Sequence, residues 1–552
     1  MPSEVPAPAR AHRWWRWALV ASAIAVLYAV YWRESWSAAA NSDSAAIALQ
    51  AWDVLHGNVL LHGWWMADVT FYTTEVPQYA ILEAIGGLGP WVVHVAAAMS
   101  YTLIVVLVAL LAKGGATGRE GWTRALLGAL IAGSPQVSGA LTLLLGPDHT
   151  GTSVPILATW LFIDRARPRW YVPLIAGLLL TWIMVADSVV LVTGIAPLII
   201  AAGVRAFRPN RAGQRRHELS LAGAAVAAAI LGTLIPKLIV RLGGYQAWPF
   251  QTHTMPLSAL PRDAWDTFQA VLELFGADVF GARPFGEQVL CALHFAGVLL
   301  AAVAVGVAVR RFLRADGILV PALAVAIVLE LAAFLISIHS SNLASIREIA
   351  PVMPLAAVLA GRLLAAPLLA LFAPGARTRA MPARSGGAAA AVGTVVAGVV
   401  LAGYLAALAY GAAQPSIPSA NQDLARWLAA HDLSRGFGAY WQADSVTLDT
   451  GGKVRVSGVV IARDGRLGRY LWESRTSDYA HHLRDATFVV AGGPKSLLPI
   501  PGLAAAAIRT FGPPAHVHHV GQYTVLTWQR QRPSTASHDS ATGTARTTRP
   551  RG

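Results

Sequence analysis

The feature that most constrains this chain is a series of long apolar segments that recurs along its first 410 residues. A helix needs about 17–25 mostly apolar residues to cross the hydrocarbon core of a bilayer. Only 13% of the residues are charged, whereas soluble domains carry about 25%. The sequence therefore predicts a polytopic α-helical membrane protein with about 11 transmembrane helices, at 17–32, 91–112, 125–145, 150–163, 171–186, 188–204, 219–240, 290–309, 317–337, 349–371 and 387–410.

The charges between these segments predict the orientation of the chain. One alternating set of connecting segments holds 20 Lys and Arg residues against five Asp and Glu residues, and the opposite set holds few basic residues. Because cytoplasmic loops collect Lys and Arg, we expect a cytoplasmic N-terminus (1–16) and an extracytoplasmic C-terminus. The net charge of +14 then mostly marks membrane orientation, so we expect membrane lipids as partners and no nucleic acid.

The first apolar segment has an alternative interpretation as a cleaved signal peptide, because Ala38, Ala39 and Ala40 imitate a cleavage site. Arg33 and Glu34 interrupt the approach to that site. We therefore expect an uncleaved anchor.

Around the membrane domain (17–410), three segments are too long to be simple connectors. They are two large outer loops, 33–90 and 241–289, and a C-terminal extracytoplasmic α/β domain, 411–529. The last residues, 530–552, are rich in Ser, Thr and Arg without an apolar pattern, which predicts a disordered tail. Within the C-terminal domain the pattern predicts a helix at about 419–431 and strands at 438–442, 454–462, 487–491 and 523–528.

The first large loop carries the most informative polar residues. Apolar positions from Ala45 to Leu55 follow a helical period, and Gly57 suits the end of a helix. Asp43 stands just before this helix, where the helix dipole favours a carboxylate. On spacing alone, Asp43 is equally well explained as a residue that caps the helix.

The spacing of this loop resembles the first-loop signature of polyprenyl-phosphate-sugar-dependent glycosyltransferases of the GT-C fold, of an actinobacterial type, which include aminoarabinose and protein O-mannosyl transferases. Ser44, Ile47 and Val54 depart from the usual residues of that signature. The resemblance implies that Asp43 is the general base and that the donor is a polyprenyl-phosphate-linked sugar. The residues that match the signature are Asp43, Ala48, Asp53, Leu55 and Gly57.

A second segment resembles the Arg-x-x-x-Pro-x-x-Pro entry to a late span of the same enzyme class. It contains Arg347, Pro351 and Pro354. Arg binds phosphate well because its planar guanidinium donates parallel hydrogen bonds, so Arg347 is the expected phosphate partner, and His339 is a weaker candidate. The alternative for Arg347 is an interfacial anchor paired with Glu348.

Other outer residues are candidates for substrate binding. Asp148 and His149 lie in a short loop between spans and are also weak candidates for a divalent cation, a cofactor that stays possible. Asp53 and Asp68 lie in the first large loop, among Trp and Tyr side chains that either contact sugar or mark the membrane interface. For Asp148, a turn that caps the next helix is the simpler alternative.

These features predict a membrane glycosyltransferase that moves a sugar to a hydroxyl of a cell-envelope glycan, lipid or protein at the outer face, by an inverting mechanism. A transporter or lipid flippase and a non-enzymatic cell-envelope assembly protein are the alternatives. The separation of Asp43 from Arg347 discriminates between them, because more than roughly 15 Å is beyond what contacts of near hydrogen-bond length to one sugar phosphate can bridge.

Overall fold

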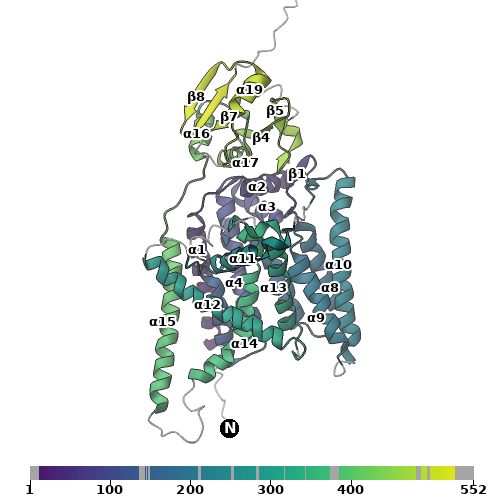
Figure 1. The fold of residues 1–552 in the computed structure, drawn as a ribbon, viewed down its shortest axis with the longest axis vertical. Coiled ribbons are helices and arrows are strands. Elements are labelled where there is room, and N and C mark those ends of the chain that lie inside the picture. Colours follow the sequence, from purple (N-terminus) through teal and green to yellow (C-terminus); the bar gives the residue numbers. More distant parts are fainter. Residues whose placement is uncertain are drawn as a thin grey trace, which may run out of the picture.

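The structure is a computed structural model that describes residues 11–135, 143, 144, 146, 149–208, 213–249, 254–280, 285–315, 317–341, 343–372, 385–479, 486–493 and 498–528. Figure 1 shows a layer of long helices with a sheet-containing C-terminal domain on one of its ends. Helices α2 (Ser42–Leu55) and α3 (Glu75–Gly86), from the first large loop, lie between the helical layer and that domain.

The helical layer follows the apolar segments of the sequence. In the described part of the chain, five helices are long and apolar enough to cross a membrane: α4 (Trp91–Lys113), α10 (Arg215–Arg241), α12 (Phe285–Arg310), α13 (Leu319–Ile336) and α14 (Val352–Phe372). A polytopic helical membrane protein is therefore confirmed, whereas the number 11 stays a prediction. The remaining predicted spans fall on helices α1 (Ala11–Ser35), α5 (Gly118–Gly133), α7 (His149–Arg165), α8 (Tyr171–Ala186), η1 with α9 (Leu191–Ala206) and α15 (Ser385–Ala413).

Helix α2 begins as the apolar period predicts, but its cap differs from the expectation. Asn41 is the N-cap: its side chain accepts a hydrogen bond from the backbone of Ser44, whose hydroxyl oxygen accepts one from Asn41 N in return. Asp43 therefore lies inside the first helical turn, and the interpretation of Asp43 as the capping residue is wrong. The carboxylate of Asp43 is not used as the helix cap, and the helix dipole still favours its negative charge.

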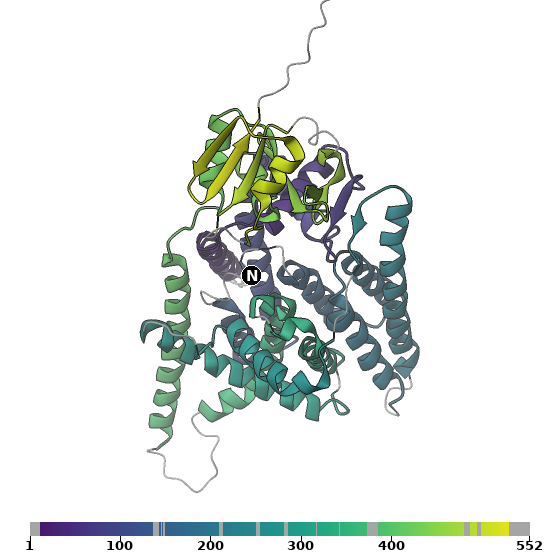
Figure 2. The same ribbon diagram turned by 45° about the horizontal axis from the view of Figure 1, so that its top comes forward.

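The C-terminal domain is built on a six-stranded mixed sheet with strand order β5-β4-β3-β7-β9-β8. Strands β4, β3 and β7 are parallel, and the other pairs are antiparallel. Figure 2 shows this sheet above the helical layer. Its strands are β3 (Arg435–Gly438), β4 (Arg455–Ile461), β5 (Leu467–Arg469), β7 (Phe488–Gly492), β8 (His516–Val520) and β9 (Tyr523–Thr527).

Helices α16 (Gln422–Ala430), α17 (Tyr440–Asp449) and α19 (Leu503–Phe511) complete the domain. The expected strand at 438–442 is wrong, since β3 ends at Gly438 and α17 begins two residues later. The aromatic residues Tyr440 and Trp441 suggest a strand by propensity, but α17 packs between β4 and α2, and this tertiary packing overrides the local preference.

A second, three-stranded sheet joins both large loops to the C-terminal domain. Strand β1 (Trp64–Met66), from the first loop, pairs in parallel with β2 (Gln246–Ala247), from the second loop. On its other edge, β1 pairs antiparallel with β6 (Ser474–Arg475), from the C-terminal domain. Backbone hydrogen bonds therefore hold three distant segments in one register.

Close helix packing in the membrane domain gives a first testable prediction. Gly361 on α14 lies against α5 and α4, and a Cβ there would lie 2.5 Å from the backbone oxygen of Arg124 and 2.7 Å from Cβ of Ala112. Gly361→Ala should therefore lower the free energy of unfolding by about 1–3 kcal/mol, the usual cost of overpacking. Gly223→Ala on α10, where a Cβ meets no atom within 4 Å, is the matched control. Thermal unfolding in detergent measures both, and equal midpoints would contradict the packing.

Candidate active site

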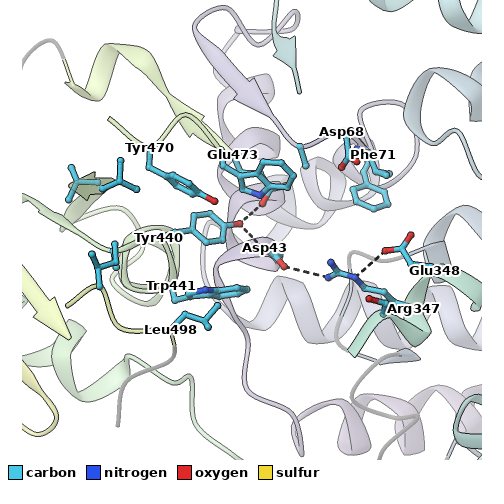
Figure 3. A pocket seen from close by; sticks show the side chains of 18 of the residues that line it. Asp43, Asp68, Phe71, Arg347, Glu348, Tyr440, Trp441, Tyr470, Glu473 and Leu498 are labelled. Atoms are coloured by element: carbon cyan, nitrogen blue, oxygen red, sulfur yellow. Dashed lines mark hydrogen bonds and ion pairs between the residues drawn. The ribbon is translucent and has the colours of Figure 1, made fainter. Parts of the chain in front are cut away.

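A cavity of about 660 Å³ lies between the membrane domain and the C-terminal domain. One wall comes from α2, the loop after β1 and the segment before α14, and the other comes from the sheet domain (Figure 3). The charged side chains that line it are Asp43, Asp68, His149, Arg347, Glu348 and Glu473. Four of these residues were predicted site residues: Asp43, Asp68, His149 and Arg347.

Asp43 and Arg347 meet in this cavity. Oδ2 of Asp43 lies 3.7 Å from Nη1 of Arg347, and the two side chains are 24% and 48% exposed. Arg347 lies in the short helix η5 (Leu343–Ile349), directly before α14, and Nε lies 3.5 Å from Oε1 of Glu348. Glu348 is thus a neighbour of Arg347, as the anchor alternative expected, but Arg347 also reaches Asp43 across the cavity (Figure 3).

On the other side, Asp43 contacts the C-terminal domain through a tyrosine. The hydroxyl of Tyr440 lies 2.5 Å from Oδ1 of Asp43 and 2.6 Å from Oε2 of Glu473. Ser42 also donates a hydrogen bond of 2.8 Å to the backbone oxygen of Tyr440. Asp43, the residue expected to act as base, is therefore in direct contact with Tyr440, 397 positions later in the sequence.

The number of available protons determines which group donates in each of these hydrogen bonds. A tyrosine hydroxyl donates one proton and accepts through oxygen lone pairs, so two carboxylates at hydrogen-bond distance cannot both be acceptors. Burial raises the pKa of Glu473 well above its usual range, and the nearby charge of Asp43 adds to this. Glu473 is therefore the protonated partner. It donates to Tyr440, and Tyr440 donates to Asp43.

Backbone strain gathers around the same cavity. In the described residues, Phe71, Glu473 and Leu498 have positive φ angles of 49°, 44° and 41°, and all three line the cavity. Left-handed backbone at non-glycine residues costs about 1–3 kcal/mol and is typical of functional sites. The position of Glu473 beside Tyr440 is therefore held by the surrounding fold at an energetic cost.

A buried charge network lies behind Arg347. The ring of His149 lies between two carboxylates, with Nδ1 at 2.6 Å from Asp187 and Nε2 at 2.9 Å from Glu348. Both ring nitrogens must donate, so the ring is an imidazolium. Burial by itself would raise the pKa of Glu348, but the hydrogen bond and charge of His149, with the charge of Arg347, lower it to about 2. Glu348 is therefore an anion that holds the Nε atom of Arg347 in place.

Of the remaining predicted site residues discussed next, Asp68 lines this cavity, whereas Asp53 and His339 do not. Asp68 lines the cavity from the loop after β1, where Oδ1 accepts a hydrogen bond of 3.1 Å from the backbone of Val69. Asp53 does not line this cavity, because its oxygens accept hydrogen bonds from Arg475 and Trp64, each at 2.8 Å. His339 lies outside the lining in the short helix η4 (Ile338–Ser341), although its charge also acts on Glu348.

The expected metal candidates do not form a binding group in the described part of the chain, which holds no cluster of three or more metal-ligating side chains. Both nitrogens of His149 are engaged by carboxylates, and Asp148 lies outside the described residues. A divalent cation therefore stays a prediction.

Sequence reasoning missed Tyr440, Glu473 and the role of Glu348. Tyr440 and Glu473 lie in the C-terminal domain, with neither a motif nor a helical period to indicate them. Asp187, which directly follows α8, is 1% exposed, and its carboxylate holds His149. A buried carboxylate at a span end was the available signal.

Comparison with known proteins identifies the fold. No protein-family model and no curated protein matches the sequence. The solved structure of ArnT from Cupriavidus metallidurans bound to undecaprenyl phosphate is similar over 92% of this chain and 97% of that chain, with 13% identity and a TM-score of 0.51. The archaeal oligosaccharyltransferase AglB from Archaeoglobus fulgidus, in complex with an inhibitory peptide and a dolichol-phosphate, aligns over 87% of this chain and 70% of that chain, with 13% identity and a TM-score of 0.44. The chain has the GT-C fold that the first-loop resemblance predicted, and the actinobacterial type stays a prediction.

The protonation of Glu473 gives a prediction for stability against pH. A carboxyl whose pKa is higher in the folded than in the unfolded protein keeps its proton on folding, so its stabilising contribution is complete below the unfolded pKa, near 4.5, and is lost as the pH rises towards the folded value. Glu473→Gln imitates the protonated group, so its thermal midpoint should fall less than that of the wild type between pH 5 and pH 8. Parallel midpoint curves would contradict a protonated Glu473. Asp464→Asn, at an exposed turn of the same domain, is the control.

Proposed function

We propose that this chain is a membrane glycosyltransferase that moves a sugar from a polyprenyl-phosphate donor to a cell-envelope acceptor hydroxyl at the outer face of the membrane. The GT-C fold shared with the ArnT structure, which holds undecaprenyl phosphate, supports this proposal. The observation that carries it is the contact of 3.7 Å between Asp43 and Arg347 inside a cavity of about 660 Å³.

The two side chains suit the two halves of a displacement at a sugar carbon. The carboxylate of Asp43 takes the proton of the acceptor hydroxyl while that oxygen forms a bond to the anomeric carbon. The bond from the anomeric carbon to the phosphate oxygen breaks, and its electron pair leaves with the polyprenyl phosphate. Arg347 stabilises that anion. A single displacement of this kind inverts the configuration of the anomeric carbon.

The ion pair between the two side chains links donor binding to the activity of the base. In the structure, Arg347 lies against both Asp43 and Glu348. A donor phosphate competes with Asp43 for the guanidinium, because a phosphate offers Arg parallel charge-assisted hydrogen bonds. Donor binding therefore releases the Asp43 carboxylate for proton transfer. Tyr440 still orients it through Oδ1.

The same geometry weighs against the two alternatives. A scaffold without catalytic function has no need to bring a carboxylate and an arginine into contact inside one cavity. A transporter pathway is expected near the bilayer midplane. This cavity instead lies between the first large loop, with the segment before α14, and the C-terminal domain, which is at one end of the helical layer (Figure 1).

The base is tested by Asp43→Asn, which keeps the shape of the side chain and an oxygen for Tyr440 but removes the proton acceptor. Sugar transfer from labelled polyprenyl-phosphate donors in membranes should fall roughly 10²–10⁴-fold, while expression and binding of undecaprenyl phosphate persist. Asp423→Asn on α16, where the side chain is 91% exposed, should leave transfer unchanged. Full activity of Asp43→Asn would remove Asp43 from the mechanism.

The phosphate partner is tested by Arg347→Gln. We expect the dissociation constant for undecaprenyl phosphate, measured with the protein in nanodiscs, to rise about 10–100-fold, which corresponds to the loss of one hydrogen bond to a charged group. Arg426→Gln, an exposed pair member on α16, is the matched control. An unchanged dissociation constant in Arg347→Gln would show that phosphate binds elsewhere.

A further inference from the structure

A second cavity, of about 130 Å³, lies directly beside the first. It is formed between α2 and β1 of the first large loop and α17, β4 and β6 of the C-terminal domain. Tyr440 and Trp472 line both cavities. Two aromatic side chains thus border both the second cavity and the space that contains Asp43.

The charged groups of the second cavity largely neutralise one another. Nη1 of Arg475 lies 2.8 Å from Asp53, and Nη2 lies 3.2 Å from Asp478. Nη1 of Arg455 lies 3.8 Å from Asp478. Both arginines therefore already face carboxylates, so the cavity lacks the spare positive charge that a phosphate needs.

Asp444 is the remaining acid of the cavity, one helical turn after Tyr440 on α17. Within the described part of the chain, no side chain or backbone group makes a hydrogen bond with its carboxyl group. Burial raises the pKa of Asp444 well above its usual range, and the charges of Asp478 and Asp43 act in the same direction. Asp444 is therefore a neutral carboxylic acid, which offers a ligand one donor and at least one acceptor.

The rest of the lining combines apolar rings with small polar groups. Trp52 and Trp64 contribute aromatic surface from the first loop, and Trp472 and Tyr440 contribute it from the C-terminal domain. Sites for drug-sized ligands occupy about 300–1,000 Å³ and combine apolar surface with a few placed polar groups. A cavity of about 130 Å³ is smaller than these sites, so its ligand is smaller than a drug-sized molecule.

We propose that the second cavity binds one uncharged saccharide unit of the acceptor. A sugar ring presents an apolar face to aromatic side chains and hydroxyl groups to a neutral carboxylic acid. The inference rests on the proposed transferase function, and it narrows the acceptor to a glycan of at least two units. A unit bound in the second cavity places the next unit past Tyr440 and Trp472, with a hydroxyl at Asp43.

The test is direct binding of neutral disaccharides of mannose, galactose, glucose and arabinose to the full-length protein in nanodiscs, by saturation-transfer NMR. We expect at least one disaccharide to bind the wild type. Asp444→Leu should weaken that binding by about tenfold or more, as for a lost hydrogen-bond partner. Asp444→Asn, which keeps the polar groups of the protonated acid, should bind as the wild type does, and so should the exposed control Asp423→Leu.

The inference is overturned if no disaccharide binds the wild type, or if Asp444→Leu binds as tightly as the wild type. Displacement of the disaccharide by inorganic phosphate would also overturn it if the displacement is equally strong in Arg347→Gln. The second cavity would then be an anion site. If Asp444→Leu does not fold, Arg455→Met at the cavity edge, where the side chain is 46% exposed, replaces it with the same expected loss.

The same experiment separates this inference from the proposed function. Disaccharide binding without any sugar transfer by the wild type would reject the transferase and keep the saccharide site. Transfer to acceptors without disaccharide binding would keep the transferase and reject the saccharide site.

Discussion

The geometry around Asp43 depends on the docking of the C-terminal domain onto the first large loop. Asp53 and Arg475 make a charge-assisted contact of 2.8 Å across this junction, and β1 pairs with β6 beside it. Neither half of the chain contains a complete cavity, because Asp43 lies on one side of the junction and Tyr440 on the other. The predicted substrate-binding residue Asp53 thus supports the site from outside the main cavity.

Within the cavity, the position of each proton follows from burial and from the count of donors. Glu473 stays protonated because it is buried beside another acid, and His149 stays charged because carboxylates face both of its nitrogens. A neutral acid thus lies close to Asp43, and a fixed anion lies beside Arg347. Low local polarity makes both arrangements strong, since a buried polar group without a partner is costly.

The membrane helices and the polar end of the first loop were predictable from the sequence, because a bilayer demands long apolar segments and because Asp43 begins an amphipathic period. Strands β4, β7 and β9 follow clear apolar runs bounded by turns. The partners of Asp43 were not predictable. Tyr440 lies 397 residues away, in a helix that local propensity takes for a strand, and only tertiary docking brings it to the site.

The division of the cavity between two domains restricts how this protein can change in evolution. The sheet of the C-terminal domain has its own hydrophobic core, so a related domain exchanged for it would fold independently. Such an exchange would nevertheless separate Asp43 from Tyr440 and Glu473, and Asp53 from Arg475. Substitutions at the junction of the two domains are therefore expected to be accepted only in combination.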